Sequence, residues 1–289
     1  MDYQGHIIRP PSEAGSIILQ VTVGCSHNKC TFCGAYKGQR FSIKKDDILS
    51  RDIAFAARHH RNRRRMFLCD GDGMIVPHQR LLRILAEIRE SLPWITRVGI
   101  YANAKSLKRK TVEELRQLKA LGLGIVYMGL ESGDNAILEN VCKSVDSADI
   151  VTQGRKVRQS GIKLNVTVIL GLAGPERSNV HARETGRALS EMNPDYVGAL
   201  TLMLIPGTPL HRDWEAGQFN LLRPKDMLRE LRTMIVHTHL SKGLFFANHA
   251  SNYLPIRARL PRDKESTIHL IDLALDERIP LKPNWMRAL

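Results

Sequence analysis

Apolar residues along the chain follow two alternating patterns. Near-continuous apolar runs occupy residues 16–23, 65–68, 96–102, 124–128, 163–170 and 196–203. Such runs are typical of parallel β-strands that are buried on both faces, because neither face then requires an alternating polar position. The pattern therefore predicts six strands.

The segments between these runs carry apolar residues at helical spacing. The first covers residues 44–60, and the next steps by four, three and four through Leu81, Leu85, Ile88 and Leu92. Thr111 and Glu114 have the spacing of a capping box, which predicts the start of another helix. A later segment shows a mixed stripe of Val180, Glu184, Ala188 and Met192. Strands that alternate with helices predict βαβ units and hence a parallel sheet.

Six βαβ-type repeats are too many for a small sheet. We therefore expect an α/β protein built as an open or partial (β/α)6 TIM-like barrel, with a doubly wound sheet as the alternative. The alternation stops near Gly217, so we expect a core at residues 1–217 and a small α/β extension at 218–289. In the extension, the pattern predicts helices at 225–240 and 264–276 and a short apolar run at 244–247.

Glycine, acidic and amide residues gather where the predicted strands end. In chain order these sites read GCSHNKC, CDGDG, YANA, GLESGD, GLAGPE and LIPGTPL. In barrels and doubly wound sheets, ligands bind at the carboxyl ends of the strands. Each sequence alone is ordinary turn chemistry, but together they predict one ligand site built from six loops.

The charge balance is strongly basic. With 43 Lys and Arg against 29 Asp and Glu, the formal net charge is +14, which favours an acidic partner. The densest basic run, residues 58–65, is either the solvated end of a predicted helix or a docking surface for an acidic electron donor or RNA. Three Trp, six Tyr and seven Phe are not interleaved with it, so a base-stacking surface for nucleic acid is not favoured.

Targeting signals are not evident in the sequence. No apolar run reaches the roughly 20 residues of a membrane span, and the N-terminal residues lack the apolar stretch of a secretory signal. The five cysteines are odd in number and three are bunched, which argues against a disulfide framework. We therefore expect a cytoplasmic protein.

Cys25, Cys30 and Cys33 lie in a C-x4-C-x2-C arrangement. A tetrahedral zinc site would need His27 as a fourth ligand inside the same short loop, and no second cysteine pair follows. A plant-type [2Fe–2S] centre has the same local spacing and would need Cys69, at the end of a predicted buried strand, as its fourth ligand. A [4Fe–4S] cluster with three protein ligands would leave one iron open for chemistry.

Taken with the strand ends, the cysteine loop resembles that of radical S-adenosylmethionine (radical SAM) enzymes. The resemblance also rests on Asp70-Gly71-Asp72, where the family often has Gly-Gly-Glu, on Gly129-Leu-Glu-Ser-Gly133 and on Gly171, and it covers residues 17–217. GLESG and Pro206-Gly-Thr-Pro209 resemble the subgroup of coproporphyrinogen oxidase-like and methylthiotransferase-like enzymes. The first cysteine gap is one residue longer than the common family spacing, C-x3-C-x2-C.

The resemblance implies that Cys25, Cys30 and Cys33 ligate a [4Fe–4S] cluster whose fourth iron is chelated by S-adenosylmethionine (SAM). Phe32 would contact the adenine, with core packing as the alternative. The implied chemistry is reductive cleavage of SAM and hydrogen abstraction from a substrate that the sequence does not identify. An acidic donor such as flavodoxin or ferredoxin would supply the electron.

The same resemblance assigns roles to the other strand ends. Asp72 would receive the methionyl ammonium of SAM, with the backbone of Asp70 and Gly71 close by. Glu131 would face the ribose hydroxyls or the ammonium, with Ser132 beside it. The alternatives are an ordinary Asp-Gly turn for Asp72 and, for Glu131, a cap on the helix that begins near Asn135. These roles follow from the family pattern alone.

Further cavity residues are expected after the third and fifth predicted strands. Gly171 would make room for the adenine, and Asn103 and Tyr101 would either line the cavity or pack in the core. Residues 245–255 hold five polar side chains that form either a substrate gate or a self-satisfied loop.

Four remaining residues are expected to have no catalytic role. We expect Cys69 to be buried, Cys142 to lie at the surface or pack, and His181 and His211 to be solvated. Two other classes of function stay open: a [2Fe–2S] electron carrier, and a basic nucleic-acid-binding protein with a structural metal.

Overall fold

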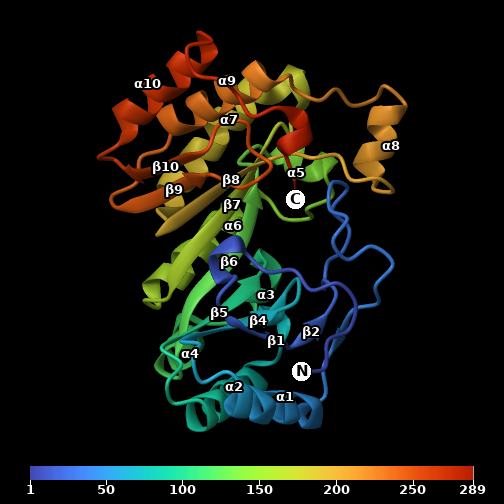
Figure 1. Ribbon diagram of the computed structural model, residues 1–289, viewed down its shortest axis with the longest axis vertical. Coiled ribbons are helices and arrows are strands. Elements are labelled where there is room, and N and C mark those ends of the chain that lie inside the picture. Colours follow the sequence, from blue (N-terminus) through green and yellow to red (C-terminus); the bar gives the residue numbers. More distant parts are fainter. Residues whose placement is uncertain (289) are drawn as a thin grey trace. The chain divides into compact units, whose positions relative to one another are not determined.

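The structure is a computed structural model that describes residues 1–288 (Figure 1). Within these residues the chain forms two compact units. The first unit comprises Met1–Asn28, Ala35–Met128 and Lys156–Leu164, and the second comprises Lys29–Gly34, Gly129–Arg155 and the residues from Asn165 onward. Three elements described below, β6, α6 and β7, have residues in both units.

Parallel strands form the centre of the first unit. They are β1 (Ile17–Gln20), β4 (Arg65–Cys69), β5 (Arg97–Ala102) and β6 (Leu123–Glu131). Neighbours pair in parallel, so Gln20 lies opposite Cys69 where β1 and β4 end. The strand side chains Leu19, Phe67 and Leu68 are fully buried, as the continuous apolar runs predicted. A small antiparallel pair, β2 (Thr22–Val23) and β3 (Ser42–Ile43), lies next to the cysteine loop.

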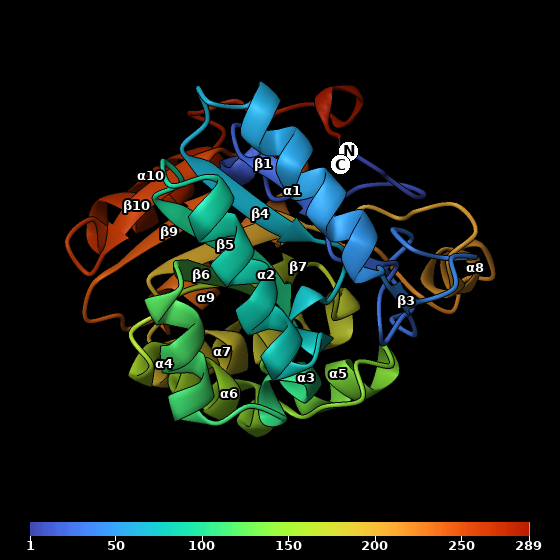
Figure 2. The same cartoon turned by 90° about the horizontal axis from the view of Figure 1, so that it is seen from below.

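Helices of the first unit cover these strands. They are α1 (Asp46–His59), α2 (His78–Ser91), α3 (Ala104–Lys108) and α4 (Val112–Ala120), with the 3-10 turns η1 (Pro11–Glu13) and η2 (Gly73–Ile75). α1 and α2 lie side by side (Figures 1 and 2). The predicted capping box is confirmed, because Thr111 and Glu114 bond each other's backbone amides at the start of α4.

The second unit combines parallel strands with longer helices. In chain order the elements that lie mainly in it are α5 (Asn135–Asn140), α6 (Ser147–Gln159), β7 (Lys163–Leu170), α7 (Gly174–Met192), β8 (Tyr196–Thr201), α8 (Pro209–Glu215), α9 (Pro224–Val236), β9 (Gly243–Ala247), β10 (Ile256–Leu260), α10 (Lys264–Leu275) and η3 (Asn284–Met286). β7, β8 and β9 are parallel, whereas β10 is antiparallel to β9. α9 packs against both α7 and α10.

The strands of the main sheet follow the order β1-β4-β5-β6-β7-β8-β9-β10. The order is linear, so within the described residues the sheet does not close. This confirms the predicted α/β fold with a mostly parallel, open sheet. No helix among residues 1–288 is long and apolar enough to span a membrane.

The predicted stripe of α7 is confirmed at Ala188 and Met192, which are buried, and is wrong at its first position. Val180 is 40% exposed, whereas His181 is fully buried. The reason is the close approach of α9: a Cβ on Gly186 would lie 2.7 Å from the Met234 carbonyl oxygen. Because a glycine faces the neighbouring helix there, the inward face of α7 cannot be read from its large apolar residues.

Candidate functional site

Asp72 is the centre of a hydrogen-bond network in the first unit. Its buried carboxylate accepts through Oδ1 from Ser106 Oγ at 2.7 Å and the Asn103 amide at 3.3 Å. Oδ2 accepts from Ser26 Oγ at 2.6 Å and from Asn103 Nδ2 at 2.8 Å. Burial raises the pKa of Asp72, and the hydrogen bonds from Ser26 and Ser106 oppose that rise. A carboxylate has about four acceptor sites, and protein donors fill them.

This geometry departs from the expected contact between Asp72 and a ligand ammonium. An ammonium would have to displace Ser26, Ser106 or Asn103 to reach the carboxylate. What the network does is fix Ser26, which follows Cys25, against the start of α3, where Asn103 and Ser106 form a second capping box. Asp72 therefore orders the cysteine loop within the first unit.

Gly71 lies directly against the first cysteine of the cluster motif. A Cβ added to Gly71 would lie 2.8 Å from the Cys25 Cβ and 2.7 Å from the ring of Tyr36. Real Cβ atoms do not approach that closely, so only glycine allows the loop after β4 to cradle Cys25.

Asp70 holds the other side of this loop. Its carboxylate accepts from Gln20 Nε2 at 2.7 Å and from the Tyr36 hydroxyl at 3.1 Å. Burial raises the pKa of Asp70, and these two hydrogen bonds oppose the rise. Asp70 thus ties the end of β1 to the segment that follows the cysteines.

Tyr101 is used for packing. Its ring meets Phe67 edge to face, with centroids 4.8 Å apart, and lies 6.2 Å from the ring of Tyr127. Burial raises the pKa of Tyr101. Of the two predicted cavity residues after the third strand, Asn103 belongs to the Asp72 network and Tyr101 to an aromatic cluster.

The second unit holds the segment Lys29–Gly34, which carries the other two cysteines. The Thr31 amide donates to the Val141 carbonyl at 3.0 Å, and the Thr31 carbonyl accepts from the Leu210 amide at 3.1 Å. Phe32 packs, partly buried, against an apolar cluster that includes Ile137, Leu172, Leu202 and Leu210. The core-packing alternative for Phe32 therefore has direct support.

Glu131 ends β6 in a backbone conformation that only glycine adopts freely. Its φ is +63°, in the left-handed region, which non-glycine residues occupy at some energetic cost. Its Oε1 accepts from Lys143 Nζ at 2.8 Å, with side chains 11% and 12% exposed. A Cβ on Gly129 would collide with that carboxylate. The first glycine of GLESG therefore makes room for the glutamate two residues later.

Ser132 connects this turn to a buried histidine. Ser132 Oγ accepts from the Asp134 amide at 3.0 Å and lies 2.7 Å from His181 Nδ1, to which it donates when Nε2 carries the ring hydrogen. His181 Nε2 then donates to the Ile169 carbonyl at 3.1 Å. Burial lowers the pKa of His181 to about 4. The prediction of a solvated His181 is wrong, because the ring is enclosed and both nitrogens are bonded.

Gly171 follows β7 with φ +80°, a conformation that explains the glycine. Its amide donates to Glu230 Oε1 at 2.6 Å, and Ser178 Oγ donates to the other carboxylate oxygen. A Cβ here would collide with Met227 of α9. Burial raises the pKa of Glu230 to about 7.

Sequence reasoning missed Ser26, Ser106, Lys143 and Glu230. Only Glu230 had a readable signal, because it interrupts an apolar stripe that runs through Met227, Leu231 and Met234. A lone acidic residue in such a stripe needs a buried partner. The other three are ordinary polar residues whose partners are distant in the sequence.

The Radical SAM superfamily model matches residues 19–184, more than half of the chain. The chain belongs to the radical SAM superfamily. The match runs from β1 into α7 and so includes the cysteine loop and the loops after β4, β6 and β7. The predicted family is confirmed, the protein is a radical SAM enzyme, and its cofactors are a [4Fe–4S] cluster and SAM.

Relatives of this radical SAM enzyme are distant. An uncharacterized protein of Methanocaldococcus jannaschii is 23% identical over 281 residues, which cover 93% of this chain and 79% of that protein. The structure of coproporphyrinogen III oxidase from Escherichia coli is similar with a TM-score of 0.55 and 16% identity, over 76% of this chain and 51% of that one. Methylornithine synthase is similar with a TM-score of 0.54 and 16% identity, over 78% and 63%. The chain spans less than two thirds of either solved structure, and the likeness shows a shared fold.

The cysteines of this radical SAM enzyme suit an iron–sulfur cluster in their chemistry. The side chains of Cys25, Cys30 and Cys33 are all partly exposed, and Gly71 leaves the cradle beside Cys25 clear. Cys69 is fully buried and burial raises the pKa of its thiol, which disfavours it as a fourth thiolate. In residues 1–288, no three His, Cys, Asp or Glu side chains are gathered to hold a metal. The shared ligation of one cluster stays a prediction.

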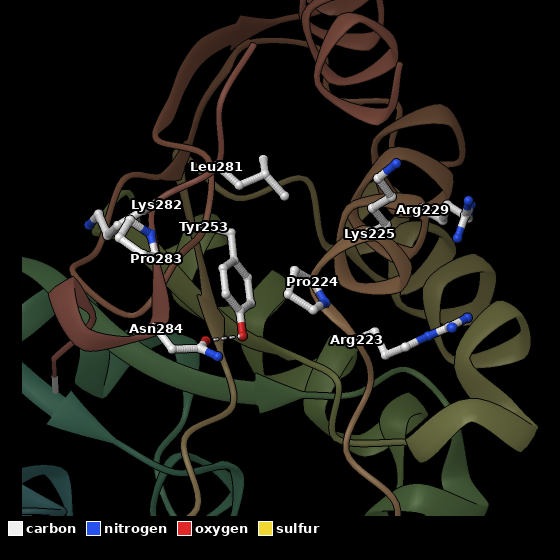
Figure 3. Close-up of a pocket in the computed structure, with 9 residues that line it drawn as sticks. All are labelled: Arg223, Pro224, Lys225, Arg229, Tyr253, Leu281, Lys282, Pro283 and Asn284. Atoms are coloured by element: carbon white, nitrogen blue, oxygen red, sulfur yellow. Dashed lines mark hydrogen bonds between the residues drawn. The ribbon is translucent and has the colours of Figure 1, made fainter. Parts of the chain in front are cut away.

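One cavity in the second unit lies apart from the predicted cofactor residues. Its volume is about 600 Å³, and Tyr253, Pro224 and Leu281 face it (Figure 3). The charged end of Arg223 points away from it, toward Asp226 at 2.9 Å. None of the cysteines or strand-end residues discussed above lines this space.

The predicted gate at residues 245–255 uses its polar groups internally. Asn252 accepts from Thr201 Oγ1 at 2.8 Å and donates to the Ala199 carbonyl at 2.9 Å. Ser251 Oγ accepts from the Thr201 amide at 3.2 Å and lies 2.9 Å from His249 Nδ1. Of the two alternatives for this segment, the self-satisfied loop has support.

Proposed function

We propose that Cys25, Cys30 and Cys33 hold the [4Fe–4S] cluster and that the enzyme cleaves SAM to remove a hydrogen atom from an organic substrate. The observation that carries this is the family match, which spans the cysteine loop and the loops after β4, β6 and β7. When bound, the cluster supplies the electron that splits SAM into methionine and a 5′-deoxyadenosyl radical. The protein's task is then to orient the groups and to exclude water.

In this proposal the residues of the first unit shape the surroundings of Cys25. Because Gly71 has no side chain, the loop after β4 can lie against Cys25 without displacing it. Asp70 anchors that loop. Asp72 positions Cys25 through Ser26, with Asn103 completing the network. This role replaces the direct ammonium contact, because the four acceptor sites of Asp72 are in use.

The residues of the second unit would contact SAM. Glu131 keeps an acceptor for the ribose hydroxyls while Lys143 balances its charge. Ser132 and Gly171 shape the loops on either side of the adenine. Phe32 supports the cysteine segment by packing, partly buried, against its apolar cluster.

The electron donor in this proposal is an acidic protein of the flavodoxin or ferredoxin type. The net charge of +14 supports a negatively charged partner. The substrate is an organic molecule or macromolecule whose identity awaits a screen for compounds that accelerate SAM cleavage.

Anaerobic reconstitution tests the proposal. With iron, sulfide, SAM and a strong reductant, we expect the broad visible absorption band of a [4Fe–4S] protein, and release of 5′-deoxyadenosine and methionine in equal amounts. Cys30→Ala is expected to lose both the cluster and the cleavage. A fully loaded wild-type protein that releases neither product would contradict the proposal.

Cys142→Ala is the matched control. Cys142 is exposed and lies outside the C-x4-C-x2-C motif, so iron content and 5′-deoxyadenosine release should stay at the wild-type level. Loss of the cluster in this variant instead would mean that the ligand set is wrong.

A further inference from the structure

A cluster of buried polar side chains lies behind two of the loops proposed to contact SAM. Ser132, His181 and Thr185 have no exposed surface, and Glu230 is 2% exposed. The loops lead out of β6 and β7, whereas the side chains that hold them come from α7 and α9. All members of this cluster belong to the second unit.

We propose that His181 and Glu230 are positioning residues that set the loops after β6 and β7 for SAM. The inference rests on the proposed function and deepens it, since neither residue contacts the cofactor in this role. Each acts through a separate branch of hydrogen bonds, and the two branches meet where His181 Nε2 lies 3.6 Å from Glu230 Oε1.

The His181 branch holds the turn that follows Glu131. The ring accepts from Ser132 Oγ at 2.7 Å, and Ser132 in turn accepts the Asp134 amide at 3.0 Å. One helical turn along α7, Thr185 Oγ1 accepts the Gly133 amide at 2.8 Å. The backbone directly after the left-handed Glu131 is therefore bonded to α7, and this keeps the unfavourable φ of Glu131 in place.

Gly133 makes this close docking possible. A Cβ at this position would collide with the backbone of α7 at Glu184 and Thr185. The second glycine of GLESG is thus explained by contact with α7.

The Glu230 branch holds the loop after β7. Glu230 Oε1 accepts the Gly171 amide at 2.6 Å, so the direction of that peptide is fixed from α9. Ser178 of α7 bonds the second carboxylate oxygen. Without Glu230 the Gly171 amide would be a buried donor without a partner, which costs more than the bond itself contributes.

The protonation state of His181 agrees with the directions of its hydrogen bonds. Burial lowers the pKa of His181 to about 4, so at neutral pH the ring is uncharged and Nδ1 can accept from Ser132. The charge of Asp134 opposes this lowering of the His181 pKa, and Asp134 pairs with Arg177 at 2.8 Å. On α9, Asp226 pairs with Arg229, and Arg232 pairs with Asp272 of α10, all on more exposed positions.

Two substitutions separate the branches. Glu230→Met removes the acceptor of the Gly171 amide at similar volume, and His181→Leu removes the acceptor of Ser132. In the cofactor-free protein, Glu230→Met should speed hydrogen exchange at Gly171 by about tenfold or more while the amides of Gly133 and Asp134 stay protected. His181→Leu should instead speed exchange at the Asp134 amide, whose acceptor Ser132 loses its own partner, while Gly171 stays protected and Gly133 keeps its bond to Thr185.

Binding of SAM to the oxidised, cluster-loaded protein, where no cleavage occurs, is the second measurement. Both variants should bind about tenfold more weakly than wild type. Glu230→Gln keeps an acceptor for Gly171 and a donor for Ser178, so it should restore both affinity and protection. Thr238→Val is the control for general destabilisation, because the buried Thr238 follows α9 and its hydroxyl donates to the Met234 carbonyl and to neither loop.

The outcomes are decisive in each direction. Exchange that rises equally in both loops for either variant, or wild-type affinity in Glu230→Met and His181→Leu, would overturn the positioning roles. If the wild-type protein itself fails to bind SAM, the proposed function fails, while the exchange data on the cofactor-free protein still decide whether the two branches exist.

Discussion

At the scale of single residues, Gly71 constrains the first cysteine of the motif directly. Its missing side chain is what lets the loop after β4 touch Cys25, with 2.8 Å between an added Cβ and the Cys25 Cβ. A displaced Cys25 would be poorly placed to bind iron, whatever the state of the other two thiols.

Gly71→Ala is therefore expected to fold but to load iron poorly. We expect iron per chain after reconstitution to fall several-fold, measured by colorimetric iron and sulfide assays, with an unchanged far-ultraviolet circular dichroism spectrum. Gly15→Ala is the matched control in the same unit, since its added Cβ would be 3.6 Å from the nearest atom, on a flexible arginine. Full iron loading of Gly71→Ala would show that the cradle is not required.

The sequence predicted which residues belong to the candidate site, but it did not predict which side chains hydrogen-bond to them. Bunched cysteines, and glycines placed where buried strands end, are uncommon outside ligand sites and tight turns, so the motif residues stood out in the sequence. Asp72, by contrast, is bound by Ser26 and Ser106, which lie 46 and 34 residues away. Such pairings depend on which strands are neighbours, and that is decided only by the whole fold.

At the scale of elements, the pairing of α7 with α9 buries two titratable groups. Burial raises the pKa of Glu230 from 4.5 to about 7, so Glu230 binds its proton more tightly in the folded protein than in the unfolded chain. The stability that this contributes is present below pH 4.5 and is lost as the pH rises through 7. His181 behaves oppositely: its pKa falls from 6.5 to about 4, so its contribution is lost as the pH falls across that interval.

Glu230→Gln should remove the pH dependence of stability that arises from Glu230. Relative to wild type, the variant should gain about 3 kcal/mol in the free energy of unfolding between about pH 4.5 and pH 7.5. Urea unfolding of the cofactor-free protein, followed by circular dichroism at several pH values, measures this. Parallel pH curves for the two proteins would mean that Glu230 does not titrate near neutral pH.

Strands were easier to predict than the faces of helices. The apolar runs located β4 to β8 because strands buried on both faces need apolar residues throughout. The inward face of α7 was located only in part, at Ala188 and Met192, because the rest of it contains Gly186 and bonded polar side chains, which carry little apolar signal. β10 was not predicted, although IRARL alternates strictly between apolar and charged residues.

At the scale of the whole molecule, the charge of +14 is the property with the clearest outward effect. The basic run after α1 is largely exposed, and Arg61 lies over the Trp94 ring at 5.7 Å. A surface of this sign speeds encounter with acidic proteins, and salt screens that attraction over roughly 8–10 Å.

SAM cleavage should therefore respond to salt only when a protein supplies the electrons. With an acidic flavodoxin-type donor, the initial rate should fall several-fold between about 50 and 300 mM NaCl. With dithionite, a small reductant, the rate should change little over the same range. Equal salt responses with both reductants would argue that the basic surface plays no part in electron delivery.

Thr31, bonded through both its amide and its carbonyl, affects how readily the enzyme takes up its cluster. Ordering a flexible loop costs about 1–2 kcal/mol of conformational entropy per residue. In this protein Cys30 and Cys33 flank a residue already held by Val141 and Leu210. The conformational entropy of this segment is lost when the second unit folds, so its loss does not reduce the affinity for iron. Two of the three thiols therefore lie in a segment that is ordered before iron binds.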